Sequence, residues 1–362
     1  VCMLKHYQKL DVCIKIAGTL TMGAAGGWVC SRLSMPLPWL IGSMVTCTFF
    51  SMYGIRIQST TVLRPFAIPI LGIMLGSGFT PDVLPEIKGW AATLGWLCLF
   101  VTALTAVGAL ALKYFKLGDS VTVFFSATPG GFSEMVLLAE SFKGNERIVS
   151  LIHATRILIT ILVIPIWFHI FKGYVPPPTL AQGTIDTIAI NDLFILITCA
   201  LAGYFGGKKL GLPAATLLGP AILSATAHIT GITTAKPPGE ALIITQLIIG
   251  TSVGSRFIGV TLQEIKSSIL AGIALSIFML TSAALVAYCL SIFLQVDFNA
   301  LWLAFAPGGL AEMTLISLAM GIDVAFVSTH HMARIMILVL LAPIAFKLIN
   351  KALSLASNKT SD

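Results

Sequence analysis

The feature that most constrains this chain is a Pro-Gly-Gly-x-x-Glu-Met motif that occurs twice, each time inside a long apolar segment. The first copy covers residues 129–135 and the second covers residues 307–313. Proline lacks a backbone donor and glycine tolerates most φ/ψ values, so the motif predicts a break in a helix. The glutamate after each break, Glu134 or Glu312, would then lie at membrane depth. An ionisable group at that depth is costly and marks a candidate functional site.

Composition indicates a membrane protein. Of the 362 residues, 57% are hydrophobic and only 10% are charged, whereas about 25% are charged in a soluble domain. The mean hydropathy is +0.95. The net charge of +7 is spread through short loops and forms no basic helix or arm, which argues against nucleic acid as a partner. The seven cysteines form no C-x-x-C pair, so neither a metal site nor a disulfide framework is expected.

Twelve apolar segments follow a short basic N-terminus, and most approach the ~20 residues that a spanning helix needs. We therefore expect an all-α polytopic protein, multi-pass in a membrane, without a cleavable signal peptide. The segments lie at 13–30, 36–53, 62–80, 90–112, 119–140 and 148–171, then at 192–206, 213–230, 240–258, 268–293, 300–320 and 326–349.

The two halves of the chain form an internal duplication at an offset of 178 residues. The expected organisation is a membrane repeat over 1–174, a Pro-rich linker over 175–191 and a second membrane repeat over 192–362. Each repeat also carries a Gly-x-x-x-Gly pair, which we interpret as a site of close helix packing. The offset relates Pro129 to Pro307, Glu134 to Glu312, His153 to His331, Arg156 to Arg334, and the pair Gly72 and Gly76 to the pair Gly250 and Gly254.

Loop charge indicates how the two copies are oriented, because Lys and Arg stay on the cytoplasmic side. If every segment crosses, the inside loops hold 12 of these residues and the outside loops hold 8, setting aside Arg156 and Arg334. If segments 119–140 and 300–320 instead enter and return at their breaks, the counts become 16 and 4. The second arrangement has five crossings per copy, so the repeats are inverted and both termini are cytoplasmic. Because a broken crossing helix would leave the same pattern, the sequence predicts ten to twelve membrane segments.

Inverted repeats with interrupted helices are typical of secondary transporters, whose sites lie near the bilayer midplane. At a break, the N-terminus of one half-helix offers free N–H groups that suit an anion. The carbonyls of the other half-helix suit a cation. We therefore expect transport of a small solute coupled to H⁺ or Na⁺, without a cofactor or catalytic residue. The expected partners are membrane lipid and the solute or ion, and a homodimer is left open.

The charged residues each have two interpretations. Glu134 and Glu312 are candidate proton or cation carriers, or else structural partners of an arginine. Arg156 and Arg334 bind a substrate carboxylate in a bidentate manner, or are the fixed counter-charges of the glutamates.

The polar neighbours of these residues complete the candidate site. His153 and His331 precede the arginines by one helical turn, and they either relay protons or are hydrogen-bonded core residues. Thr128 and Ser133 are replaced by alanine in the second copy, so the two sites are not chemically equal. The candidate binding set is Thr128, Gly130, Gly131, Ser133, Glu134, His153, Arg156, Gly308, Gly309, Glu312, His331 and Arg334.

The duplicated motif, the His-x-x-Arg pair after each copy and the two-half layout resemble the bacterial AbrB-type membrane protein family, in the Gram-negative form with an internal AbrB duplication. The resemblance covers nearly the whole chain. It implies a multi-pass protein of the bacterial inner membrane that carries two labels, an ammonia monooxygenase and a regulator of gene expression. More distantly, the break followed by Lys143-Gly144 is similar to the sodium/bile-acid symporter and cation/proton antiporter superfamily. That similarity implies a transporter, in which the broken helix usually crosses completely.

Neither family label matches a feature of the residues. A monooxygenase needs redox metal ligands, yet the six histidines are scattered and no H-E-x-x-H or cysteine cluster occurs. We therefore expect no enzyme. Direct regulation needs an effector or DNA-binding domain, and no loop is long enough to form one. Regulation would then act indirectly, through a transported metabolite or a partner.

Overall fold

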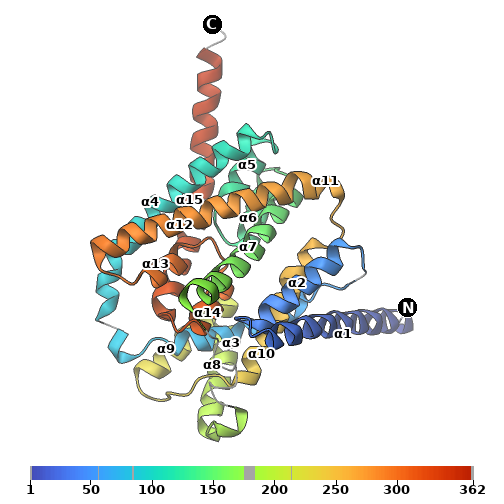
Figure 1. Cartoon of the computed structure of the whole chain (residues 1–362), viewed down its shortest axis with the longest axis vertical. Helices are drawn as coiled ribbons and strands as arrows, with labels where there is room; N and C mark the ends of the chain where they lie inside the picture. Colours follow the sequence, from blue (N-terminus) through green and yellow to red (C-terminus); the bar gives the residue numbers. More distant parts are fainter. Residues whose placement is uncertain (1, 56, 84, 175–183, 213, 360–362) are drawn as a thin grey trace. The chain divides into compact units, whose positions relative to one another are not determined.

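The computed structural model describes residues 2–359 apart from 56, 84, 175–183 and 213, and every regular element in this part of the chain is a helix (Figure 1). Among these residues, six stretches of helix are long and apolar enough to cross a membrane, as expected for an all-α membrane protein. They are Asp11–Arg32 of α1 (Cys2–Arg32), α4 (Trp90–Tyr114), α7 (Glu146–Lys172), α8 (Ile190–Lys209), Leu262–Leu294 through α11 (Leu262–Glu264) and α12 (Leu270–Leu294), and Val324–Ile349 of α15 (Val324–Lys359).

Shorter helices account for the remaining apolar segments. The segments 119–140 and 300–320 each contain two short helices, and the other segments each contain one α-helix. Helices at repeat-related positions have equal lengths in several cases, for example 15 residues in α2 and α9. The number of membrane segments and the orientation of the repeats stay predictions. The shorter helices are α2 (Pro38–Met52), α3 (Arg64–Gly76), α5 (Ser120–Ala127), α6 (Phe132–Ser141), α9 (Ala215–Ile229), α10 (Gly239–Gly254), α13 (Phe298–Phe305) and α14 (Leu310–Ala319).

Tertiary packing divides the chain into two compact units, and each unit takes segments from both halves of the sequence. These units do not coincide with the repeats over 1–174 and 192–362, which stay a prediction about the duplication. Part of the predicted linker, 175–183, lies outside the described residues. Unit 1 consists of Val1–Trp90, Leu158–Thr261 and Ala311–Ser328, and unit 2 consists of Ala91–Ile157, Leu262–Leu310 and Thr329–Asp362.

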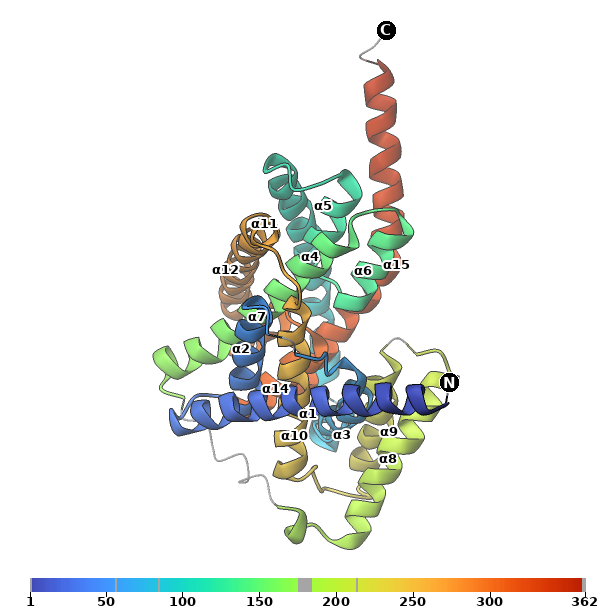
Figure 2. The same cartoon turned by 90° about the vertical axis from the view of Figure 1, so that its right-hand side faces the viewer.

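Unit 1 is built by a reciprocal exchange between the two halves. Helix α2 of the first half packs against α10 of the second, and α9 of the second half packs against α3 of the first. Each of these pairs is flanked by a long helix, since α1 packs on α2 and α8 packs on α9 (Figure 2). Because α2 corresponds to α9 and α3 to α10 in the duplication, the same helix contact occurs twice with the halves exchanged.

The predicted close packing at the Gly-x-x-x-Gly pairs is confirmed, and it occurs at these exchanged contacts. A Cβ atom on Gly72 would lie 2.5 Å from the carbonyl oxygen of Leu217 in α9. A Cβ atom on Gly250 would lie 2.5 Å from the carbonyl oxygen of Leu40 in α2. No side chain fits at either position without moving a backbone, so the glycines set the distance between the helices.

Unit 2 places a helical hairpin, α5 and α6, on an aromatic core. Phe124 and Phe125 of α5 pack with Met135 of α6, and Phe346 of α15 closes the cluster. The ring of Phe346 lies 5.4 Å from that of Phe124 and 5.7 Å from that of Phe125, centroid to centroid. This core anchors both half-helices that flank the first Pro-Gly-Gly motif.

Candidate functional site

The helix breaks predicted at the two motifs are present. Helix α5 ends at Ala127, the backbone is extended at Thr128 and at Gly131, and α6 begins at Phe132. Helix α13 ends at Phe305, and the chain returns to helix with α14. The breaks leave the last carbonyls of α5 and α13 without donors from their own helices, so these groups require other partners.

At the first break, the partners are the predicted arginine and histidine of α7. The Arg156 guanidinium donates from Nη2 to the carbonyl of Gly130 at 2.9 Å and from Nη1 to the carbonyl of Thr128 at 3.4 Å. The ring of His153 forms a hydrogen bond from Nε2 to the carbonyl of Phe125 at 3.0 Å. Both side chains are buried.

The second break repeats this arrangement with residues of α15. Arg334 donates to the carbonyl of Ala306 at 2.6 Å and to that of Gly308 at 2.5 Å. His331 contacts the carbonyl of Leu303 at 2.8 Å through Nε2. A carbonyl accepts and does not donate, so Nε2 of each histidine carries a proton. We call these two sets of contacts the Arg–His braces.

The braces give the arginines a role that the sequence did not suggest. Its two alternatives for Arg156 and Arg334 were a substrate carboxylate and a glutamate, whereas the contacts at the breaks join each guanidinium to backbone carbonyls. The planar fork of arginine suits two neighbouring acceptors, and its charge complements the partial negative charge at a helix C-terminus. The histidines are buried, and each is hydrogen-bonded to a backbone carbonyl.

Glu134 lies in the first turn of α6, directly after the first break. It is half-buried, and its carboxylate folds back over Gly131, where a Cβ atom would lie 2.1 Å from Oε2. This location is favourable because the N-terminus of a helix carries a partial positive charge. The predicted hydroxyl neighbours lie differently: Thr128 donates to the Phe124 carbonyl at 2.8 Å, and Ser133 is exposed.

The end of α6 returns to the start of α5. The backbone N–H of Asn145, just beyond α6, donates to Oγ1 of Thr122 at 2.8 Å. A Cβ atom on Gly144 would lie 2.8 Å from the side chain of Val121. The start of α5 and the turn after α6 therefore lie beside each other.

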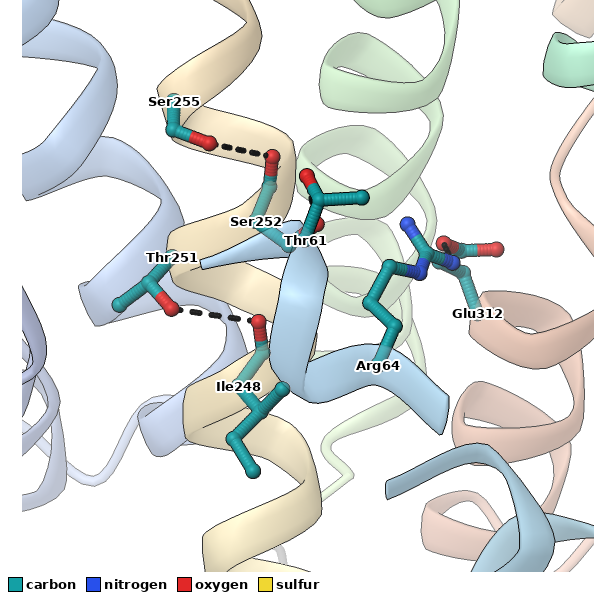
Figure 3. Close-up of polar contacts among 7 residues, drawn as sticks. All are labelled: Thr61, Arg64, Ile248, Thr251, Ser252, Ser255 and Glu312. Carbon is teal, nitrogen blue, oxygen red and sulfur yellow. Dashed lines mark hydrogen bonds and ion pairs between the residues drawn. The ribbon is translucent and has the colours of Figure 1, made fainter. Parts of the chain in front are cut away.

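Glu312, the second predicted carboxylate, forms an ion pair within unit 1. Its Oε1 lies 3.3 Å from Nη2 of Arg64, the first residue of α3. Figure 3 shows the two side chains close together. The side chains are only 4% and 15% exposed, so water screens this pair weakly. The other end of α14 is also held by the first half of the chain, because the hydroxyl of Tyr174 donates to the carbonyl of Ala319.

Further polar groups surround this ion pair. Arg256, which follows α10, interacts electrostatically with both Arg64 and Glu312. The hydroxyl of Thr61, one turn before Arg64, lies 3.3 Å from that of Ser252 (Figure 3). We name these five residues, Thr61, Arg64, Ser252, Arg256 and Glu312, the Arg64 cluster.

Sequence reasoning missed the two arginines of the Arg64 cluster, because it counted both among the loop charges. The structure places Arg64 in the first turn of α3 and Arg256 in a short turn after α10. One signal was present: at the offset of 178 residues, Arg64 corresponds to Leu242 and Arg256 to Gly78. Neither arginine of the Arg64 cluster is therefore repeated at the duplicated position.

A metal site was not predicted, and the described residues contain no group of three or more His, Cys, Asp or Glu side chains that could hold a metal ion. The two braced breaks and the Arg64 cluster are the candidate sites.

Long apolar helices together with two helices interrupted at Pro-Gly-Gly define a helical protein of the membrane type. The chain belongs to the AbrB family, whose model, described as transition state regulatory protein AbrB, matches residues 39–350. It is 28% identical to the Bacillus subtilis (strain 168) protein YhjN over 355 residues, which cover 91% of this chain and 92% of that protein. It is 27% identical to an Escherichia coli (strain K12) protein, named as a proposed regulator AbrB, over 314 residues that cover 85% of this chain and 89% of that protein.

Proposed function

We propose that the protein is a secondary transporter of a small solute in a bacterial inner membrane, coupled to H⁺ or Na⁺. The observation that carries the proposal is the pair of helices interrupted at Pro-Gly-Gly, each followed by a glutamate in the first turn of the next half-helix. A continuous spanning helix satisfies its backbone groups internally, whereas an interrupted helix leaves some of them free inside the membrane. Transporters use such free groups to bind substrate and ion near the bilayer midplane.

A re-entrant geometry of the first interrupted helix is part of this proposal. The hydrogen bond from Asn145 to Thr122 supports it, because the two ends of the α5–α6 hairpin lie beside each other. If the second interrupted helix has the same geometry, each repeat has five crossings. The repeats are then inverted, and both termini are cytoplasmic.

The Arg–His braces favour a proton as the coupling ion. The carbonyls that could have coordinated a cation at each break already accept hydrogen bonds from Arg156 or Arg334. Each break is also followed by a titratable carboxylate, Glu134 or Glu312. A buried carboxylate is costly when charged and unpaired, so taking up a proton is a natural way to neutralise it.

The test is flux in proteoliposomes that contain the purified full-length protein and a trapped pH-sensitive dye. Small amines, amino acids and carboxylates are added outside one at a time, with and without a Na⁺ gradient. We expect at least one solute to move protons in a protein-dependent manner, and both Glu134→Gln and Glu312→Gln to abolish the coupled movement. Full coupled flux in both variants would exclude the glutamates as proton carriers, and no solute-dependent flux with either ion would contradict the transporter proposal.

The names of the family and of the Escherichia coli relative refer to regulation. A transporter accommodates such a role without a DNA-binding domain, because changing the concentration of a metabolite inside the cell changes the activity of regulators that bind it. Regulation would therefore be an indirect consequence of transport.

A further inference from the structure

A groove runs along α4, α5 and α15 within unit 2. It encloses about 430 Å³, which lies within the roughly 300–1,000 Å³ of sites for small molecules. One face of α4 lines it from Val101 to Lys113, and one face of α15 lines it from Ile337 to Ile349. Residues of α5 and its C-cap, from Ser120 to Thr128, complete the wall. We call this feature the α4–α15 groove.

The wall of the groove is apolar along most of its length. Thr102, Thr105 and Thr128 each donate the hydroxyl proton to the carbonyl four residues earlier in the chain, at 2.8 Å. Their hydroxyl protons are therefore already used. Among the described residues that line the groove, the other polar side chains are Ser120 and Lys113. Hydrocarbon is the chemistry that matches such a wall.

One end of the groove is positively charged. Lys113 lies in the last turn of α4 and Ser120 is the first residue of α5, so both lie where the chain passes from α4 to α5. Lys347 of α15 approaches this end, because its Nζ lies 5.9 Å from the ring centroid of Phe142, at the turn beside the start of α5. Asp119, the acid at this end, accepts from a backbone N–H of α5 at 2.7 Å. The groove thus joins a cationic end to an apolar length, as an amphipathic anion requires.

The length of the groove matches one leaflet of a membrane. On both long helices the lining face spans twelve positions, from Val101 to Lys113 and from Ile337 to Ile349, and twelve residues of α-helix rise about 18 Å. Half of the hydrocarbon core of a bilayer is about 15 Å thick. Helix α4 and the stretch Val324–Ile349 of α15 are both long and apolar enough to cross a membrane. An acyl chain of one leaflet therefore fits the groove with its head group at the Lys113 end.

Small side chains keep the groove open. Ala106 of α4 and Ala345 of α15 stand in its wall, where a longer side chain would fill the space. Leu110 and Leu341, which also line the groove, are exposed. An acyl chain that enters gains dispersion contacts along these walls.

We propose that the α4–α15 groove binds one acyl chain of an anionic phospholipid, with the head-group phosphate beside Lys113. The apolar wall holds the chain, and the lysine attracts the charged head group. Phospholipid fits better than a polar soluble anion, because a polar solute would find no free hydroxyl proton at Thr102, Thr105 or Thr128. The bound chain packs along α5 as far as Thr128, so it supports the half-helix that leads into the first break.

The experiment is native mass spectrometry of the delipidated full-length protein in detergent. The protein is titrated with phosphatidylglycerol, which is anionic, or with zwitterionic phosphatidylcholine that has the same acyl chains. We expect the first phosphatidylglycerol to bind about fivefold more tightly than the first phosphatidylcholine, the effect of one lysine beside an anionic lipid. Lys113→Gln should remove this preference. Lys209→Gln is the matched control, because it removes an exposed lysine from the last turn of α8, and it should keep the preference of the wild type.

A second variant tests the groove itself. Ala106→Trp places an indole ring in the groove, so it should weaken binding of both lipids about tenfold or more. Ala202→Trp, at an exposed position of α8, is its control and should bind as the wild type does. Lys113 is exposed, so Lys113→Gln keeps the test decisive if Ala106→Trp folds poorly.

Four outcomes would each overturn the proposal. They are equal binding of the two lipids by the wild type, an unchanged preference in Lys113→Gln, unchanged binding in folded Ala106→Trp, and tighter binding of oleate than of phosphatidylglycerol. The last outcome would assign the groove to a free fatty acid instead of a membrane phospholipid.

Discussion

Arg64 and Glu312 form an ion pair, Nη2 to Oε1 at 3.3 Å, that joins two helices lying 248 residues apart in the chain. Arg64 is the first residue of α3, and Glu312 lies in the first turn of α14. The pair thus connects the first half of the sequence to the second beside a helix break.

Removal of one partner of this pair should destabilise the protein. Glu312→Gln removes the carboxylate that pairs with Arg64 in a largely buried place, and we expect the free energy of unfolding to fall by roughly 3–5 kcal/mol. The double variant Glu312→Gln with Arg64→Gln should recover most of that loss, because it removes both members of the pair. Unfolding by SDS titration in mixed micelles measures both. The exposed pair of Arg147 with Glu264 is the control, and breaking it should cost about 0–1 kcal/mol.

The Arg–His brace at the second break should depend on the shape of arginine as well as its charge. Arg334→Lys keeps the charge but cannot reach both the Ala306 and Gly308 carbonyls, since lysine presents one ammonium group. We expect a loss of about 1.5–3 kcal/mol in stability and faster hydrogen exchange over residues 303–309. Arg147→Lys is the control at a more exposed site. Unchanged stability with reduced solute binding would instead assign Arg334 to the substrate.

The exchanged helix contacts of unit 1 should tolerate no side chain at their glycines. In Gly250→Ala the new Cβ atom would lie 2.5 Å from the carbonyl oxygen of Leu40, so α10 must move away from α2. We expect a loss of about 1–3 kcal/mol, measured by the same unfolding titration. Gly206→Ala in α8 is the matched control, because no atom lies within 4 Å of its new Cβ. That variant should be neutral or more stable by up to about 1 kcal/mol.

Membrane topology can be tested at the turn after α6. In a variant without native cysteines, Asn145→Cys should resist an impermeant thiol reagent added to intact cells, because the re-entrant model places this exposed turn in the cytoplasm. Lys236→Cys, also exposed, is predicted to lie outside and should react. Ready labelling of Asn145→Cys would contradict the re-entrant model and favour a helix that crosses completely.

Much of the local structure followed from the sequence alone. The breaks at Pro129 and Pro307 were predicted at the correct positions, because proline and glycine act on the backbone of their own neighbours and need no tertiary partner. The close contacts of Gly72 and Gly250 also followed from their spacing in an apolar helix. Membrane-type helices were evident from composition and segment length.

The partners of the charged residues were decided only by the tertiary structure. Sequence spacing suggested a glutamate or a substrate for Arg156 and Arg334, whereas both guanidinium groups donate to backbone carbonyls at the breaks. A backbone carbonyl is present in every residue, so the sequence does not show which one a side chain will reach. Arg64 reaches Glu312 because α3 and α14 both fold into unit 1. Local propensity acts over a few residues and can be inferred from the sequence, whereas a contact across 248 residues depends on how whole helices pack.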